Sequence, residues 1–316
     1  MLISGKLSQK IATVTVAALI IGAPLALSGC SFGQSVEYGV YGEETAGDIE
    51  SICVNTEETD VDIVFSETAE KITVEYPQKS IGGGRPMNEV DISLESGRLR
   101  LDERRVLWLF SLFDSDERIT VTVPAGRYLN YELSTEAGDV TLGEGVRANT
   151  LDVVTTTGDI TLGSAVVTES ITLTATTGDV LLSGYVAAEE ISVSVTTGDI
   201  NLNSDVIGNR LRIVGTTSDV TASGTVKVAL LSINGTTGDV SFGGVLDARV
   251  IEIDLTTGDV ELDLIGFRDW YSITAESTTG DSNINGGSGE RTVNIKSTTG
   301  DVRINFEGIE DTVNNM

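Results

Sequence analysis

The chain of 316 residues contains no histidine, only two cysteines and only 20 basic side chains. Without histidine, the usual general base, the usual zinc ligand and every Ser–His or Cys–His nucleophile pair are excluded. Two cysteines cannot form a four-cysteine metal site or a disulfide framework. Because 48 acidic side chains give a net charge of −28, the chain repels phosphate backbones, and nucleic-acid binding is disfavoured.

The remaining composition is sufficient for a folded core. Hydrophobic residues make up 40% of the chain, which argues against global disorder. The 35 glycines follow no collagen period. The length allows one or two domains.

The first 30 residues have the pattern of a lipoprotein signal. Two lysines precede an almost wholly apolar stretch at 11–27, and Leu27-Ser28-Gly29-Cys30 resembles the bacterial lipobox, in which the signal is cut before the cysteine and the thiol is lipid-modified, for example with palmitate. We predict a signal peptide over 1–29, a lipidated Cys30 and a short tether over 30–35. A short transmembrane anchor and an ordinary cleaved signal are the alternatives, although a comfortable span needs about 20 apolar residues.

From residue 130 the sequence repeats every 20 residues, with one step of 22. Gly-Asp marks each repeat, and Ser218 replaces the glycine once. Mostly β-branched apolar residues alternate with polar ones, which is the period of half-buried strands, and nothing shows the helical period. Three of the aligned apolar columns read Leu133, Val153, Leu173, Val193, Ile213, Ile233 and Ile253; then Val140, Ile160, Val180, Ile200, Val220, Val240 and Val260; then Val146, Val166, Val186, Val206, Val226 and Leu246.

This pattern predicts an all-β fold, a parallel β-solenoid with coils of about 20 residues over 130–306. No single repeat can bury its own inner face, whereas stacked coils bury a continuous apolar column. Strands would pair with their equivalents one coil away, about 4.8 Å along the axis. Irregular alternating runs over 36–129 predict degenerate coils on the same axis, and 307–316 is a polar tail.

The Thr-Thr-Gly-Asp motif predicts a corner of each coil. Glycine permits a positive φ, and aspartate can bond nearby backbone N–H groups in an Asx-type turn. Stacking would place the carboxylates about 5 Å apart. We expect local hydrogen bonds to relieve the repulsion between these carboxylates, and we predict no metal site. Ca²⁺ bound between the coils is the alternative. The column of carboxylates consists of Asp139, Asp159, Asp179, Asp199, Asp219, Asp239 and Asp259, followed by Asp281 and Asp301.

The lipobox, the run Ile-Thr-Val-Thr-Val-Pro at 119–124 and the iterated Thr-Thr-Gly-Asp-Val resemble the bacterial putative-adhesin domains of unknown function. The resemblance covers about 36–306. It implies an extracytoplasmic β-solenoid without cofactors, here lipid-anchored to the cell membrane, that serves adhesion or, as in some relatives, the sensing of envelope stress. Its partner would be an envelope, host-surface or peptide ligand.

Catalytic chemistry finds little support. Only nine lysines and arginines lie in the 189 residues from Tyr128 onward, and they share no column that would build a cleft. The repeat produces paired carboxylates everywhere, and nothing distinguishes a pair suited to glycoside hydrolysis. We predict no enzyme; a polysaccharide-acting enzyme on this scaffold and a purely structural envelope spacer are the alternatives.

Two aromatic segments stand out. The most apolar stretch after the signal predicts either a strand or cap over the end of the solenoid, or a contact patch for a membrane or partner. The pair Trp270-Tyr271 lies at the 22-residue step, so we expect it to fill an irregular corner; spacing does not support carbohydrate stacking. The residues of the predicted contact patch are Arg104, Arg105, Trp108, Phe110 and Phe113.

Overall fold

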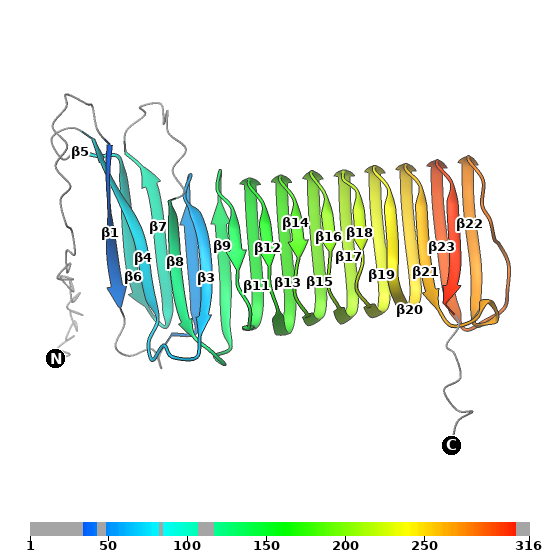
Figure 1. Cartoon of the computed structure of the whole chain (residues 1–316), viewed down its shortest axis with the longest axis horizontal. Helices are drawn as coiled ribbons and strands as arrows, with labels where there is room; N and C mark the ends of the chain where they lie inside the picture. The colour runs from blue at the N-terminus through cyan, green and yellow to red at the C-terminus, as the bar shows by residue number, and fades with distance from the viewer. Residues whose placement is uncertain (1–33, 43–48, 82–84, 107–116, 308–316) are drawn as a thin grey trace, which may run out of the picture.

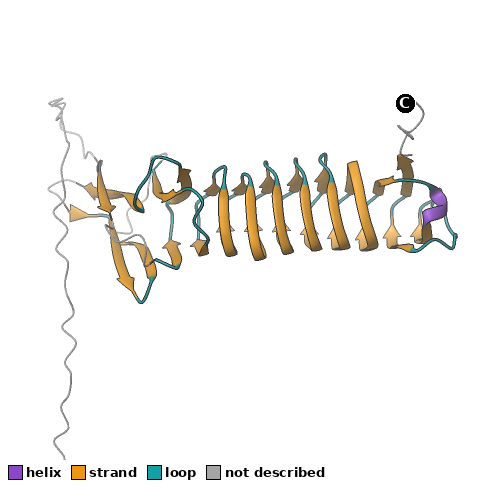
Figure 2. Cartoon of the chain, turned by 90° about the horizontal axis from the view of Figure 1, so that it is seen from below, coloured by secondary structure: helices purple, strands orange, loops and turns teal. Residues whose placement is uncertain are grey.

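The computed structural model describes residues 34–42, 49–81, 85–106 and 117–307 (Figure 1). Their strands join one sheet that winds into a parallel β-solenoid with coils about 20 residues apart, which confirms the predicted fold class. Within these ranges there is one 3₁₀ helix, η2 (Arg268–Trp270), near the C-terminal end (Figure 2). No helix within these four ranges is long and apolar enough to cross a membrane.

Each regular coil consists of one long, kinked strand and one short strand. The long strands are β9 (Leu129–Thr135), β11 (Val146–Thr157), β13 (Ala165–Thr177), β15 (Val186–Thr197), β17 (Val206–Thr217), β19 (Val226–Thr237) and β20 (Val240–Thr257), of which β20 also includes a short strand. The short strands are β10 (Val140–Leu142), β12 (Ile160–Leu162), β14 (Val180–Leu182), β16 (Ile200–Leu202), β18 (Val220–Ala222) and β21 (Val260–Ile265).

The predicted apolar columns form the core of the rod. Equivalent residues pair in parallel at intervals of 20, as in Val180 with Ile200, and the column from Val140 to Val260 is buried throughout. Neighbouring coils also adjust to each other in size, because the small Ala222 pairs with the large Phe242 and both are buried. Burial of this stack is the main force that holds the coils together.

The third predicted column is wrong at one residue. Val166 does not take the place of Val146 and Val186; Ala165 pairs with both and is buried, whereas Val166 is only half-buried. The corner before Ala165 is one residue shorter than its neighbours, and a bulge after Val166 restores the register. A fixed 20-residue alignment cannot reveal two shifts that cancel within one coil.

The N-terminal end combines two coils with antiparallel strands. Its strands are β1 (Gln34–Gly42), β2 (Ser51–Thr56), β3 (Asp60–Ser66), β4 (Thr73–Ile81), β5 (Arg85–Pro86), β6 (Asn88–Glu95), β7 (Arg98–Arg105) and β8 (Arg118–Pro124). Only β2–β3 and β7–β8 stack in parallel as coils. Strand β1 pairs antiparallel with β4, and β6 with β7, so the expectation of degenerate coils throughout 36–129 is wrong for β1, β4 and β6.

Coils at the N-terminal end do not stack in sequence order. The coil β2–β3 lies between β7–β8 and β9–β10, although β7–β8 comes later in the chain. The intervening segment forms the antiparallel strands that cover the end. The chain therefore leaves the stack after β3 and returns to it at β7.

The same exchange occurs at the C-terminal end, which comprises β22 (Tyr271–Thr279), β23 (Arg291–Thr299) and β24 (Val302–Glu307). Strand β23 pairs with β20 on one side and β22 on the other, and β24 pairs with β21. The last coil in the sequence thus lies between its two predecessors. At the irregular step of 22 residues, the chain passes over one coil position and forms β22 beyond it. Strand β23 then fills that position.

Two asparagine amides close the C-terminal edge. Asn285 donates from Nδ2 to the carbonyl of Ala275 at 2.9 Å and accepts the N–H of Ala275 on Oδ1 at 2.6 Å. Asn283 makes the same pair of bonds with Ile304, each 3.0 Å long. Each amide replaces a peptide group of a missing next strand, so groups that would template another chain are satisfied.

Candidate functional site

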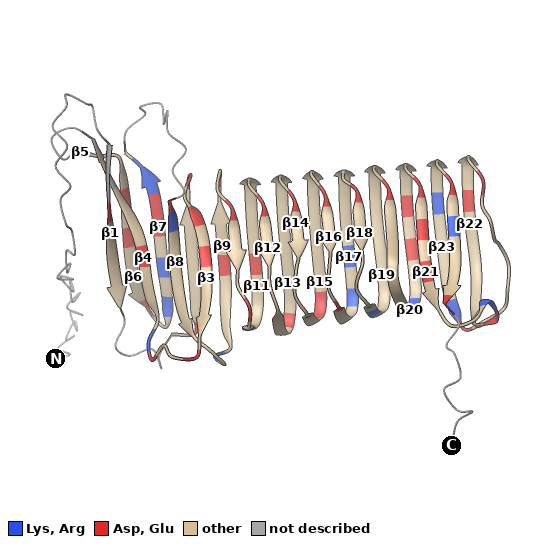
Figure 3. Ribbon diagram, in the orientation of Figure 1, with Lys and Arg blue, Asp and Glu red and all other residues tan. Residues whose placement is uncertain are grey.

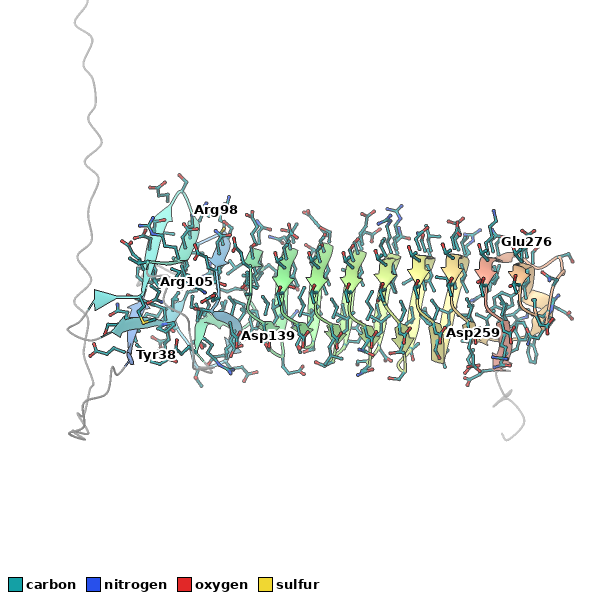
Figure 4. The ribbon with its side chains drawn as sticks, turned by 90° about the horizontal axis from the view of Figure 1, so that it is seen from above. Tyr38, Arg98, Arg105, Asp139, Asp259 and Glu276 are labelled. Carbon is teal, nitrogen blue, oxygen red and sulfur yellow. The ribbon has the colours of Figure 1, made fainter. Side chains whose placement is uncertain are left out.

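The aspartates of the Gly-Asp corners form a ladder along one edge of the rod (Figure 4). From Asp60 to Asp301, Oδ1 of each carboxylate accepts the backbone N–H of the next aspartate along the stack, at 2.7 to 3.1 Å. These bonds run between coils, so the expectation of a local Asx-type turn is wrong. Each side chain instead supplies a hydrogen-bond acceptor to the neighbouring coil. In spatial order the ladder is Asp60, Asp139, Asp159, Asp179, Asp199, Asp219, Asp239, Asp259, Asp301 and Asp281.

Asp60 is a member that the repeat pattern missed. Its Oδ1 accepts the N–H of Asp139, although Thr59 stands where the other corners have glycine or, once, serine. Burial raises the pKa of the Asp60 carboxyl above its ordinary value, and the neighbouring charge of Asp139 acts in the same direction. The sequence signal was the Asp-Val pair at 60–61, without the glycine that made the other corners recognisable.

The corner glycines are required by the close approach of the coils. Seven of them have φ between 133° and 151°, and a Cβ on any would lie 1.9 to 2.2 Å from a carbonyl oxygen of the adjacent coil. Ser218 adopts no positive φ, and its Cβ lies only 2.9 Å from where a Cβ on Gly215 would be. The glycine at 215 therefore makes room for the serine at 218.

Exposed threonines accompany the ladder. Both threonines of each motif are exposed in the regular coils, so hydroxyls and carboxylates recur in every coil along this edge. Among the described residues no three or more acidic or cysteine side chains converge into a group that could hold a metal. Binding of Ca²⁺ between coils stays a sequence-based alternative.

The basic part of the predicted contact patch is engaged with acidic side chains. Arg104 donates to Oε2 of Glu89 through Nε at 3.2 Å and Nη2 at 2.8 Å, and Arg105 forms an ion pair with Glu58. Trp108, Phe110 and Phe113 lie outside the described residues, as does Cys30. The patch therefore stays a sequence-based prediction.

The pair at the 22-residue step divides into a buried and an exposed ring. Tyr271 is buried, and its hydroxyl donates to the carbonyl of Ile265 at 2.7 Å. Trp270 is 38% exposed and packs edge-to-face on Phe267, which is 53% exposed, with the ring centroids 5.8 Å apart. Sequence reasoning missed Phe267, because a lone aromatic outside the repeat columns gives no periodic signal.

Comparisons with known proteins place this architecture in a family. The model of the family Toastrack DUF4097 matches residues 49–240 and again 185–314. A putative adhesin from Bacteroides fragilis is 13% identical, with a TM-score of 0.46 over 87% of this chain and 100% of the other. A putative adhesin from Parabacteroides distasonis is 12% identical, with a TM-score of 0.40 over 87% and 95%. The search of curated proteins finds no match. Because the family model matches most of its length, the chain belongs to the Toastrack DUF4097 family.

Proposed function

We propose that the protein is a non-catalytic, lipid-anchored surface adhesin whose rod holds a binding end away from the cell membrane. The observation that supports this most directly is the position of the chain ends. Strand β1 and the strands β22 to β24 lie at opposite ends of the rod (Figure 1). Gln34 follows Cys30 by four residues, which span at most about 14 Å. Lipidation of Cys30 would therefore hold the β1 end near the membrane.

The rod is built to resist bending. Parallel pairing, the apolar stack and the aspartate ladder each continue from coil to coil. Ten ladder positions about 4.8 Å apart give a length of roughly 43 Å. A rigid support of this length gains affinity for a surface ligand because less conformational freedom is lost on binding.

The described carboxylates offer weak support for the enzyme alternative. Asp152 has a raised pKa, caused first by burial and then by the charge of Glu132. A glycosidase acid needs such a shift. However, the two residues are equivalent positions of adjacent coils on an outer strand face, and Glu132 is ion-paired with Arg98. This environment resembles a solvated row of charges more than a catalytic pair.

Anchoring is tested with Cys30→Ala in the full chain. We expect the variant to be released into the medium or to stay uncut, whereas the wild-type protein fractionates with membranes. Unchanged processing and membrane retention of the variant would contradict the anchor.

A shortened rod distinguishes an adhesin from a structural spacer. Removal of 160–199 takes out two whole repeats and joins equivalent positions. An adhesin with its binding surface near the far end should still bind target surfaces as a purified ectodomain. If neither the full ectodomain nor the short one binds intact cells or isolated envelopes, while the short rod alters the envelope in vivo, the spacer role is correct.

A further inference from the structure

We propose that the C-terminal third of the rod binds a carboxylated glycan, such as a polymer containing uronic acids, in a cationic pocket beside the exposed aromatic pair. This inference rests on the proposed adhesin function and gives it a ligand class and a site. Figure 3 shows basic residues of this region both at the lower end of β20 and higher up on β23, near the ladder, where Arg303 pairs with Asp301. The pocket is distinct from the patch predicted from the sequence.

The pocket has a volume of about 440 Å³ and crosses several coils. Its cationic lining residues are Lys227 of β19, Arg249 of β20 and Arg291 of β23, and its acidic ones are Asp247 and Glu290. Three positive charges thus meet two negative ones in a chain whose net charge is −28. The lining therefore carries one net positive charge, opposite in sign to the chain as a whole.

The acidic residues leave one cation free for a ligand. Asp247 accepts from Nη1 of Arg291 at 2.6 Å, and Nζ of Lys227 lies 3.9 Å from its other oxygen. Arg249 is exposed and has no ion-pair partner among the residues that the structure describes. Its guanidinium can therefore bind a carboxylate with two parallel hydrogen bonds, and Lys227 can add a second charge.

Arg291 connects the pocket to the aromatic pair. Its guanidinium carbon lies 5.8 Å from the ring centroid of Trp270. The Trp270 ring is held in place by close backbone, since a Cβ on Gly266 would lie 2.3 Å from it. Phe267, packed edge-to-face on Trp270, is more than half exposed and extends the apolar surface of the aromatic pair. Ordered, exposed rings of this kind bind ligands at low entropic cost.

The combination selects the ligand class. Aromatic rings stack on the apolar faces of sugar rings, and a free arginine recognises a planar carboxylate. Nucleic acids are disfavoured by the overall negative charge. At physiological salt the Debye length is about 8 Å, so exposed carboxylates farther away than that are largely screened from a ligand in the pocket.

The test measures binding of tetragalacturonate to the purified ectodomain by calorimetry. We expect saturable binding that weakens as salt is raised, at least a tenfold loss for Arg249→Gln and at least a fivefold loss for Phe267→Ala. Arg212→Gln is the matched control, because Arg212 is also exposed and has no ion-pair partner in the described part of the chain. Its affinity should equal that of the wild type, and circular dichroism should show that all variants fold.

Several outcomes would overturn the inference. One is no binding by the wild type, and another is an equal loss for the Arg249 and Arg212 variants. Equal binding of linear polyphosphate would show a simple anion site without sugar recognition. If the ectodomain still binds cells or envelopes while tetragalacturonate does not bind, the proposed adhesin function stands and only the ligand assignment is wrong.

Discussion

The middle of the rod and its two ends stack their coils in different orders relative to the sequence. Between β9 and β21 every coil pairs with its neighbours in the sequence, and one register describes nearly all of them. At each end one coil is inserted between two others, and new elements cover the edge. A repeated sequence is therefore sufficient to stack one coil on the next, whereas the end of the stack needs residues that depart from the repeat.

The largest effect should come from a corner in the middle. A Cβ at Gly198 would lie 2.2 Å from the carbonyl oxygen of Gly178, at a φ of 133°. We expect Gly198→Ala to lower the free energy of unfolding by about 3 kcal/mol, measured by chemical denaturation. Gly126→Ala is the control, because φ is 83° there but nothing lies within 4 Å of the added Cβ. A loss of similar size at both positions would show that backbone strain, and not coil contact, is responsible.

A smaller effect on stability, with a change in association, should follow from opening the C-terminal edge. Replacing both Asn283 and Asn285 by alanine removes four hydrogen bonds to edge strands. We expect a loss of about 2 kcal/mol and concentration-dependent end-to-end association, measured by analytical ultracentrifugation. Asn234→Ala, at an exposed position in the middle, should stay monomeric like the wild type. A monomeric double variant would mean that other groups protect the edge.

The ladder should contribute less per position. Asp199→Ala leaves the N–H of Asp219 without its acceptor, so we expect a loss of about 1 kcal/mol. Asp199→Asn keeps an acceptor and removes one charge, so its stability should stay within about 0.5 kcal/mol of the wild type. Thermal melts with calcium and with a chelator should coincide. A calcium-dependent rise in melting temperature, absent with matched monovalent salt, would show that the metal alternative is correct.

The smallest effect concerns pH at the N-terminal end of the ladder. Because folding raises the pKa of Asp60, its contribution to stability is fully present below its unfolded value and is lost as pH rises through the folded value. Asp60→Asn should therefore gain melting temperature relative to the wild type as pH rises from about 3 to 7. Asp102 is the opposite control: hydrogen bonds from Arg100 lower its pKa, so Asp102→Asn should lose relative stability over the same range. Parallel pH profiles for both variants would contradict these assignments.

The candidate sites differ in how far the sequence could predict them. The carboxylate column from Asp139 to Asp259 was visible because repeat spacing places equivalent residues in line. Asp60 was not, since its corner lacks glycine. The cationic pocket could not be found either, because Lys227, Arg249 and Arg291 do not share one repeat column; Arg291 takes its place only after the last coil is inserted.

The sequence by itself determined the period, the alternation of apolar residues and the glycine at most corners, because these properties are local and recur from coil to coil. Tertiary structure alone decided the order of the end coils. Strands β22 and β23 have similar sequences and fit the same neighbour, so local pattern cannot tell which of them pairs with β20. That choice depends on how the connecting segment, with Asn283 and Asn285, satisfies the final edge. A free strand edge exposes unpaired backbone groups whatever its side chains are, and only the folded chain shows how they are covered.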